Sequence, residues 1–314
     1  MLAAVSTAAA DAPNVTTTAV AFDSPSPNGR HEIPATLLKP DGPGPFAAIV
    51  ILHDCSGLGE RSSGAPHRWA DVLVRAGFVV LIPDSFTPRG IPNGVCLESA
   101  TSGLSRDERR AVSHPARAYD AHAAKAYLQG LAYVDAARIG VMGGSHGGTS
   151  TLAAMVRGGP GQDANTLGQN GDRNGNRNGF AAGIALYPSC GVNLGDWRVT
   201  RQSRVRGPVT GYSGVFRPAA PVLILIGERD DWTPAAHCQQ LAERSAAADE
   251  PVSIKVYPGA HHSFDSSRPE IFNPNRNNIN MPNGKGATTG GNRTAWSDSI
   301  VAATAFFAQY LKPF

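Results

Sequence analysis

The residues with the clearest chemical potential are Gly-Gly-Ser-His-Gly at positions 143–147. They follow the apolar run 138–142, which we predict to be a strand, and they precede a predicted helix at 149–156. A Gly-x-Ser-x-Gly sequence in that context is typical of a nucleophile elbow, a sharp turn that exposes the serine hydroxyl. Glycines at 143 and 147 leave out side chains that the strained turn has no room for. We therefore predict that Ser145 is a nucleophile.

A serine hydroxyl is a weak nucleophile, so it needs a basic partner that is itself oriented by an acid. After an elbow of this kind the acid precedes the base along the chain. The strand predicted at 222–226 leads into a turn that contains Asp230 and Asp231. We predict Asp230 as the acid, because it lies three residues after Gly227 and leaves Thr233 and Pro234 to begin the next helix. Asp231 is the alternative.

The base is expected in the loop after the predicted strand 253–257, where His261 and His262 are adjacent. Position alone does not separate these two histidines. The tetrahedral intermediate also needs two backbone amides directed at its oxyanion. The amide of His146 follows from the elbow itself. We predict that the amide of Cys55, in the loop 53–57 after the predicted strand 46–52, is the second donor.

Other kinds of chemistry are not favoured. His53, Asp54 and His146 are the only plausible metal set, but their spacing defines no coordination geometry, so we predict neither a metal nor an organic cofactor. Charged residues make up 17% of the chain and the net charge is +3, with no cluster of Lys and Arg, which excludes a nucleic-acid partner. No run approaches the roughly 18–20 apolar residues of a membrane span. A small-molecule ester or lactone is the expected partner.

The elements that must position these residues alternate between strands and helices. Continuous apolar runs predict strands at 46–52, 78–82, 138–142, 182–187 and 222–226, with a shorter one at 253–257. Helical spacing predicts helices at 116–131, at 234–246 behind an N-cap at Thr233, and at 297–311. The runs 17–22 and 33–38 flank a Pro-rich turn and predict an antiparallel hairpin. This rhythm predicts a mostly parallel, doubly wound α/β sheet of about eight strands.

We predict one domain over residues 16–314. The Gly/Asn-rich segments 158–179 and 274–292 have few apolar residues, so we expect them to be mobile surface loops. Residues 1–15 are read either as a disordered Ala/Thr-rich terminus or as the remnant of a signal peptide.

The cysteines bear on the cellular compartment in which the protein folds. The four of them contain no Cys-x-x-Cys pair, and each follows a predicted strand. If the strand ends cluster, the bridges are Cys55–Cys96 and Cys190–Cys238. Four small buried thiols are the other interpretation. Disulfides favour a secreted or periplasmic protein over a cytoplasmic one.

Taken in order, these motifs resemble the dienelactone hydrolase family of the α/β-hydrolase fold. The resemblance runs from about residue 22 to the C-terminus and includes AAIVILHDCSGL, VVLIPDSFTPRG, DAARIGVMGGSHGG, LIGERDDWTP and YPGAHHSFD. It implies a triad of Ser145, Asp230 and His262, because the family's base lies two residues before a Phe. It also implies an oxyanion hole from the amides of Cys55 and His146, and no cofactor.

The chain departs from the family at two positions. The family's archetypes look to have Cys where this chain has Ser145, and Glu where it has Asp54. Dienelactone itself is therefore not the expected substrate, and the prediction is a serine hydrolase that cleaves carboxylic esters or lactones through an acyl-enzyme. An acyltransferase or peptidase with the same triad, and a non-catalytic binding protein on the same fold, are the alternatives.

Overall fold

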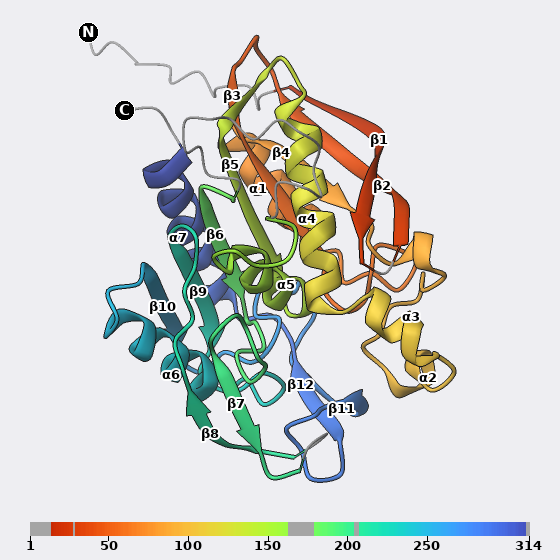
Figure 1. Cartoon of the computed structure of the whole chain (residues 1–314), viewed down its shortest axis with the longest axis vertical. Coiled ribbons are helices and arrows are strands. Elements are labelled where there is room, and N and C mark those ends of the chain that lie inside the picture. Colours follow the sequence, from red (N-terminus) through yellow and green to blue (C-terminus); the bar gives the residue numbers. More distant parts are fainter. Residues whose placement is uncertain (1–13, 28, 163–178, 204–206, 312–314) are drawn as a thin grey trace, which may run out of the picture.

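A mostly parallel sheet forms the centre of the molecule (Figure 1). The computed structural model describes residues 14–27, 29–162, 179–203 and 207–311. The sheet has eight strands in the order β1-β2-β4-β3-β5-β6-β9-β10. Strands β1 and β2 pair antiparallel, as do β2 and β4, and all later neighbours pair parallel. The strands are β1 (Val15–Ser26), β2 (Gly29–Pro40), β3 (Phe46–Leu52), β4 (Val79–Pro83), β5 (Val134–Gly144), β6 (Ala182–Leu186), β9 (Val222–Gly227) and β10 (Val252–Tyr257).

Helices cover the sheet. Helix α4 crosses in front of the sheet in Figure 1, next to α5, whereas α1 and α7 lie behind it and touch each other through the rings of Trp69 and Trp296. Helix α6 packs on β9 and β10. The helices are α1 (Ala65–Arg75), α2 (Glu98–Thr101), α3 (Arg106–Ala111), α4 (His114–Gln129), α5 (His146–Met155), α6 (Ala235–Ala246) and α7 (Arg293–Leu311), with a short 3₁₀ turn at Thr87–Arg89.

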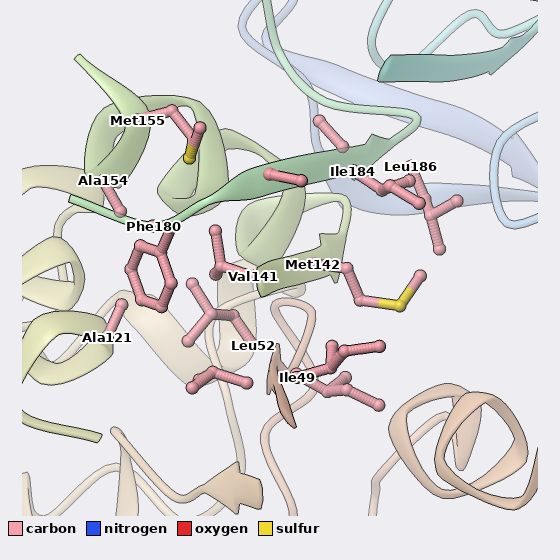
Figure 2. Packing of buried hydrophobic residues seen from close by; sticks show 14 of the residues in the cluster. Ile49, Leu52, Ala121, Val141, Met142, Ala154, Met155, Phe180, Ile184 and Leu186 are labelled. Carbon is pink, nitrogen blue, oxygen red and sulfur yellow. The ribbon is translucent and has the colours of Figure 1, made fainter. Parts of the chain in front are cut away.

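The core lies between these layers. Ile49 of β3, Val141 of β5 and Ile184 of β6 are completely buried. Val141 lies on the face covered by α4 and α5, near Ala121 and Ala154, whereas Ile49 and Ile184 lie with Met142 on the opposite face (Figure 2). Burying an aliphatic side chain of this size contributes about 1.5–3 kcal/mol. Strands covered on both faces need apolar residues at every position, which is why these runs are continuous rather than alternating.

The predicted sheet and its N-terminal hairpin are confirmed, and each predicted run overlaps an observed strand. One detail is wrong: α6 begins at Ala235, one residue late, and Thr233 is not its N-cap. The hydroxyl of Thr233 is instead bonded to the carbonyl of Tyr187 and the carboxylate of Asp230. A tertiary hydrogen bond thus replaces the local cap.

The segment 274–292 differs from the expected loop. Strands β11 (Ile271–Asn277) and β12 (Lys285–Thr289) form an antiparallel hairpin, and β7 (Arg198–Arg201) and β8 (Val209–Ser213) form a second one. Buried Asn278 donates to the carbonyls of Asp231 and Gly286, so its polar side chain orders the backbone instead of loosening it. Of the other expected loop, residues 163–178 lie outside the described part of the chain, as do residues 1–13 of the N-terminal segment; Val15 already belongs to β1.

Two disulfides are present, and they are the predicted pairs. Cys55–Cys96 joins the loop after β3 to the segment before α2, and Cys190–Cys238 joins the loop after β6 to α6. Such bridges are typical of proteins that fold outside reducing compartments. None of the helices in the described ranges is long and apolar enough to span a membrane.

Candidate active site

Ser145 lies on a strained turn between β5 and α5. Its backbone has φ 55° and ψ −115°, a combination that non-glycine residues rarely adopt, and its amide bonds to the carbonyl of Leu186. The glycines on either side have no room for a side chain. A Cβ on Gly147 would lie 2.0 Å from the carbonyl oxygen of Leu52, and one on Gly143 would lie 2.6 Å from the backbone of Gly147. The turn is therefore a nucleophile elbow in its geometry as well as its sequence.

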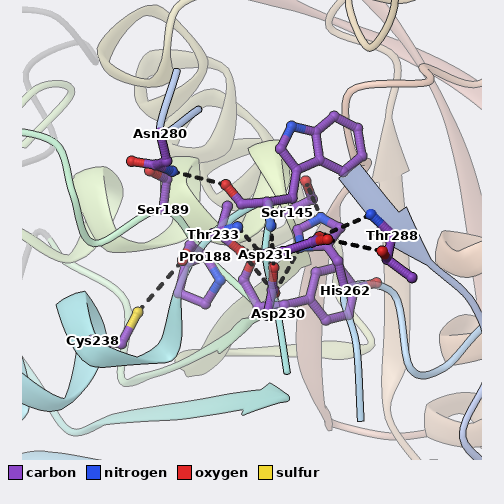
Figure 3. A network of polar contacts seen from close by, with 12 residues as sticks. Ser145, Pro188, Ser189, Asp230, Asp231, Thr233, Cys238, His262, Asn280 and Thr288 are labelled. Atoms are coloured by element: carbon purple, nitrogen blue, oxygen red, sulfur yellow. Dashed lines mark hydrogen bonds and ion pairs between the residues drawn. The ribbon is translucent and has the colours of Figure 1, made fainter. Parts of the chain in front are cut away.

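The three residues predicted as a triad form one chain of hydrogen bonds (Figure 3). Ser145 Oγ lies 2.9 Å from His262 Nε2, and His262 Nδ1 lies 2.8 Å from Asp230 Oδ2. The side chains of His262 and Asp230 are fully buried. With the proton on Nδ1 shared with the carboxylate, Nε2 is free to accept the serine proton.

Asp230 is held by the turn that follows β9. Its Oδ1 accepts from the amides of Trp232 and Thr233, and its Oδ2 accepts from the Thr233 hydroxyl. These three hydrogen bonds fix the orientation of the Asp230 carboxylate. The ring of Trp232 and that of Tyr187 pack against the imidazole of His262, with centroids 4.9 and 4.8 Å away. The imidazole of His262 is therefore oriented by packing as well as by hydrogen bonds.

The two alternative residues, Asp231 and His261, contact other partners. Asp231 accepts from the backbone amide and the hydroxyl of Thr288, so it anchors β12 (Figure 3). His261 Nδ1 lies 3.2 Å from Glu270 Oε1, and the Ser145 hydroxyl is bonded to His262 instead. The structure thus brings together Ser145, Asp230 and His262 and leaves Asp231 and His261 outside the hydrogen-bond chain.

The two amides expected to form an oxyanion hole lie in adjoining segments. His146 is the first residue of α5, and Cys55 lies in the turn after β3, where its carbonyl accepts from the amide of Val95 at 2.7 Å. The sulfurs of Cys55 and Cys96 lie close to the carboxylate of Asp54, but they are joined in a disulfide and are not available as metal ligands. Both ring nitrogens of His53 are already hydrogen-bonded, to Asp54 and to Ser85.

A cavity of about 280 Å³ opens onto Ser145 and His262. The disulfide Cys55–Cys96 forms part of its wall, and β11 and β12 contribute Ile271, Asn273 and Thr289. The second Asn-rich segment therefore edges the mouth of the site. Four arginines also line the cavity: Arg61, Arg68, Arg268 and Arg276.

The carboxylates in the same wall are Asp54 and Asp265, and both are buried in hydrogen bonds. Asp54 accepts from Ser56 and Ser63, and Asp265 accepts from Trp69 Nε1 and the Tyr187 hydroxyl. Burial raises the pKa of Asp265 above its usual value. The hydrogen-bonding capacity of both carboxylates is thus largely taken up by protein groups, whereas Arg61 and Arg268 are exposed at the rim.

Sequence reasoning missed several residues around the triad. Tyr187 and Asp265 are near predicted elements, but their bond to each other spans 78 residues and no local pattern announces it. Arg117 is completely buried beside the elbow, where its guanidinium contacts His146 and His53. The sequence gives one indication of this residue: it is a charged side chain in the Ala-rich predicted helix 116–131, at a position that should face the core.

Comparisons with known proteins identify the family of this chain. Residues 33–167 and 208–311 match the model of the dienelactone hydrolase family. The chain is 25% identical over 252 residues, covering 79% of this chain and 84% of the relative, to a Bradyrhizobium protein described as "Probable 2-oxo-3-(5-oxofuran-2-ylidene)propanoate lactonase".

Two solved structures share the fold. A dienelactone hydrolase-like promiscuous phosphotriesterase from metagenomic libraries superposes with a TM-score of 0.59 at 17% identity, covering 94% of this chain and 98% of that one. Apo esterase 2 of Thermogutta terrifontis gives 0.56 at 16% identity, covering 97% of each chain. The family match covers most of the sequence, so this chain belongs to the dienelactone hydrolase family and is a carboxylic ester hydrolase with the α/β-hydrolase fold.

Proposed function

We propose that the protein is a serine hydrolase that cleaves carboxylic esters or lactones through an acyl-enzyme. The observation that carries the proposal is the unbroken hydrogen-bond chain from Ser145 through His262 to Asp230, at the end of a cavity that could hold a small substrate. In this proposal Ser145 is the nucleophile, His262 the general base and Asp230 the residue that orients it.

The reaction would proceed in two stages. His262 Nε2 takes the proton of Ser145 as the oxygen attacks the ester carbonyl, and Asp230 stabilises the imidazolium that forms. The amides of Cys55 and His146 bind the oxyanion, and the imidazolium protonates the departing alcohol. A water activated by His262 then hydrolyses the acyl-enzyme. For a lactone, the leaving alcohol stays attached to the acyl group, so a single hydroxy acid is released.

The charge of the cavity supports a substrate that carries a carboxylate. Arg68 and Arg276 are each held by backbone carbonyls, Arg276 also lies over the ring of Trp232, and Arg61 and Arg268 are exposed at the rim. Arginine pairs well with planar anions, and none of these four forms a salt bridge with any acidic residue in the described part of the chain. The name of the Bradyrhizobium relative is that of a lactonase for such an anion, which agrees with this proposal.

The two disulfides support a location outside the cytoplasm, in the periplasm or the medium. The site would then meet esters that reach the cell from outside.

The experiment is covalent labelling combined with turnover. The wild type and Ser145→Ala are treated with a fluorophosphonate probe, the adduct is located by mass spectrometry, and rates are measured on p-nitrophenyl acetate. We expect an adduct on Ser145 and a loss of at least about 10³-fold in kcat for the variant. A folded wild type that forms no adduct on Ser145 and does not turn over esters would refute the proposal.

The substrate class is tested with matched esters. Phenyl acetate and its para-carboxylate analogue differ in one negative charge at similar size. We expect a higher kcat/KM for the charged ester, and we expect the ratio to fall in Arg276→Gln, which keeps the side chain polar but removes its charge. Equal kcat/KM values in the wild type would remove the carboxylate preference and leave the hydrolase proposal in place.

A further inference from the structure

Arg117 is a buried charge that the catalytic steps above do not use. It lies in the first turn of α4 and is completely inaccessible to solvent. Burial lowers its pKa to about 10, so it remains charged at neutral pH. Its Nε has no hydrogen-bond partner among the residues that the structure describes, and the centroid of the Phe86 ring lies 5.1 Å from the guanidinium carbon. Keeping a charge in the core is costly, so its contacts should explain why it is there.

The guanidinium connects two segments that are far apart in the chain. Nη1 donates to His146 Nδ1 at 2.8 Å, and Nη2 donates to the carbonyl oxygen of His53 at 2.8 Å. His146 is the first residue of the elbow helix, and His53 is the first residue after β3. The two segments bonded by Arg117 are therefore the ones that carry the proposed oxyanion amides, at His146 and Cys55.

In the loop after β3, a hydrogen bond from the His53 ring also fixes the peptide group that contains the Cys55 amide. His53 Nε2 accepts from the amide of Ser85, which leaves the ring proton on Nδ1, and Nδ1 lies 2.8 Å from the carbonyl oxygen of Asp54. That carbonyl and the N–H of Cys55 belong to the same peptide plane. Arg117 bonds to the peptide group between His53 and Asp54, and the His53 ring bonds to the next peptide group, between Asp54 and Cys55. The orientation of this second peptide group sets the direction of the Cys55 N–H.

On the elbow side, the ring of His146 must be neutral to accept from an arginine. Burial, helped by the positive charge of nearby Arg117, lowers the pKa of His146 well below its usual value. The pKa of His53 is lowered well below its usual value by burial and by Arg117. Both rings are therefore neutral at physiological pH, and the hydrogen-bond directions given above are the consistent ones.

We propose that Arg117 is a positioning residue that sets the separation and direction of the two oxyanion-hole amides, acting through His53 and His146. The proposal rests on the serine hydrolase mechanism above. Arginine suits this role because its two terminal nitrogens lie in a rigid plane, so two acceptors bonded to it are held at a set distance. A lysine offers a single nitrogen and cannot define that distance.

The test separates transition-state binding from substrate binding. Removing one oxyanion donor typically lowers kcat by about 10²–10³-fold. Misdirected donors should cost less, so we expect Arg117→Lys and Arg117→Met to lower kcat on p-nitrophenyl acetate by about 10–100-fold, with KM within about threefold of the wild type. The affinity for a trifluoromethyl ketone, which forms an oxyanion adduct with the serine, should fall in parallel. His146→Leu removes the acceptor but keeps the amide, and its loss should not add to that of Arg117→Lys.

Arg138→Met is the matched structural control. Arg138 also donates to two backbone carbonyls, those of Leu311 and Pro45, and it pairs with Asp135, but it lies within β5, seven residues before Ser145. We expect it to lower the melting temperature without lowering kcat. If Arg117→Met does not fold, Arg117→Lys decides: a kcat within about threefold of the wild type and an unchanged inhibitor affinity would overturn the proposal. Wild-type labelling at Ser145 reports on the mechanism separately, so a failure there is not confused with a failure of Arg117.

Discussion

The disulfide between Cys55 and Cys96 has two effects that a pair of double variants can separate. Cys55→Ser with Cys96→Ser opens a bridge across 41 residues, and Cys190→Ser with Cys238→Ser opens one across 48. The chain-entropy relation gives about 4 kcal/mol of lost stability for each, with a difference of roughly 0.1 kcal/mol. The two double variants should therefore be destabilised to nearly the same extent.

Their effects on catalysis should differ. Cys55 and Cys96 both line the cavity, and the Cys55 amide is a proposed oxyanion donor, whereas the other two cysteines do not line it. Opening the first bridge leaves the loop 53–57 held by hydrogen bonds such as that from the Val95 amide to the Cys55 carbonyl. We expect kcat to fall by about 10–100-fold in the Cys55/Cys96 variant, below the full cost of losing a donor, and by less than about threefold in the Cys190/Cys238 variant.

The assay is a urea melt for the free energy of unfolding and initial rates on p-nitrophenyl acetate, at a temperature where both variants are more than nine-tenths folded. Reduction of the wild type with dithiothreitol provides a check, because it opens both bridges without substitution. Equal losses of kcat in the two variants would refute the reasoning, since the activity would then follow stability alone. So would a Cys55/Cys96 variant that keeps wild-type kcat.

Three further predictions concern the elbow, the buried histidines and the hairpin. Gly147→Ala places a methyl group 2.0 Å from the Leu52 carbonyl, so we expect about 3 kcal/mol of destabilisation and a loss of ester turnover, whereas Gly103→Ala, where the added carbon meets no atom within 4 Å, should show neither in the same urea melts and rate assays. His114 has its pKa lowered to about 3 by burial and by nearby Arg117, so the unfolded chain binds a proton there that the folded one does not; its contribution to stability should be complete above about pH 6.5 and fall by up to about 1.4 kcal/mol per pH unit below it. Buried His53 and His146 add to the same slope, so His114→Asn should reduce it without abolishing it in urea melts at pH 7.5, 5.5 and 4.5, and an unchanged slope would contradict the assignment. Asp231→Ala frees the amide and hydroxyl of Thr288, so KM should rise about tenfold while kcat stays within about threefold, and Michaelis–Menten curves showing the reverse pattern would argue that Asp231 acts in the chemistry.

The parts of the site that could be predicted from the sequence are those with local causes. The elbow is one, because Gly143 and Gly147 make room for Ser145 within a few residues. Asp230 is another, since its place relative to the strand end and the next helix separated it from Asp231. The fold followed from continuous apolar runs, and the disulfide pairs followed from where those strands end.

What could not be predicted depends on contacts between distant segments. His261 and His262 differ by one position, and only the family resemblance favoured His262 before its bond to Asp230 was visible. Arg117 meets His53 across 64 residues, so its neighbours in the sequence say nothing of its partners. The hairpin at 274–292 was misjudged for a related reason: asparagines that look solvated in sequence, such as Asn278, satisfy buried carbonyls.

The adjacent residues Asp230 and Asp231 connect the proposed triad to the hairpin β11–β12. The carboxylate of Asp230 bonds to His262, the proposed base, and the carboxylate of Asp231 fastens β12. The last residue of β12, Thr289, forms a bridge with His262, and the next amide, at Gly290, bonds to the His262 carbonyl. The wall that meets the substrate and the residues that perform the reaction are thus not separate modules. Exchanging this hairpin with that of a relative, as a way to change specificity, would have to carry Asp231 and Thr288 with it. A graft that kept only the residues facing the cavity would lose its attachment to the catalytic turn.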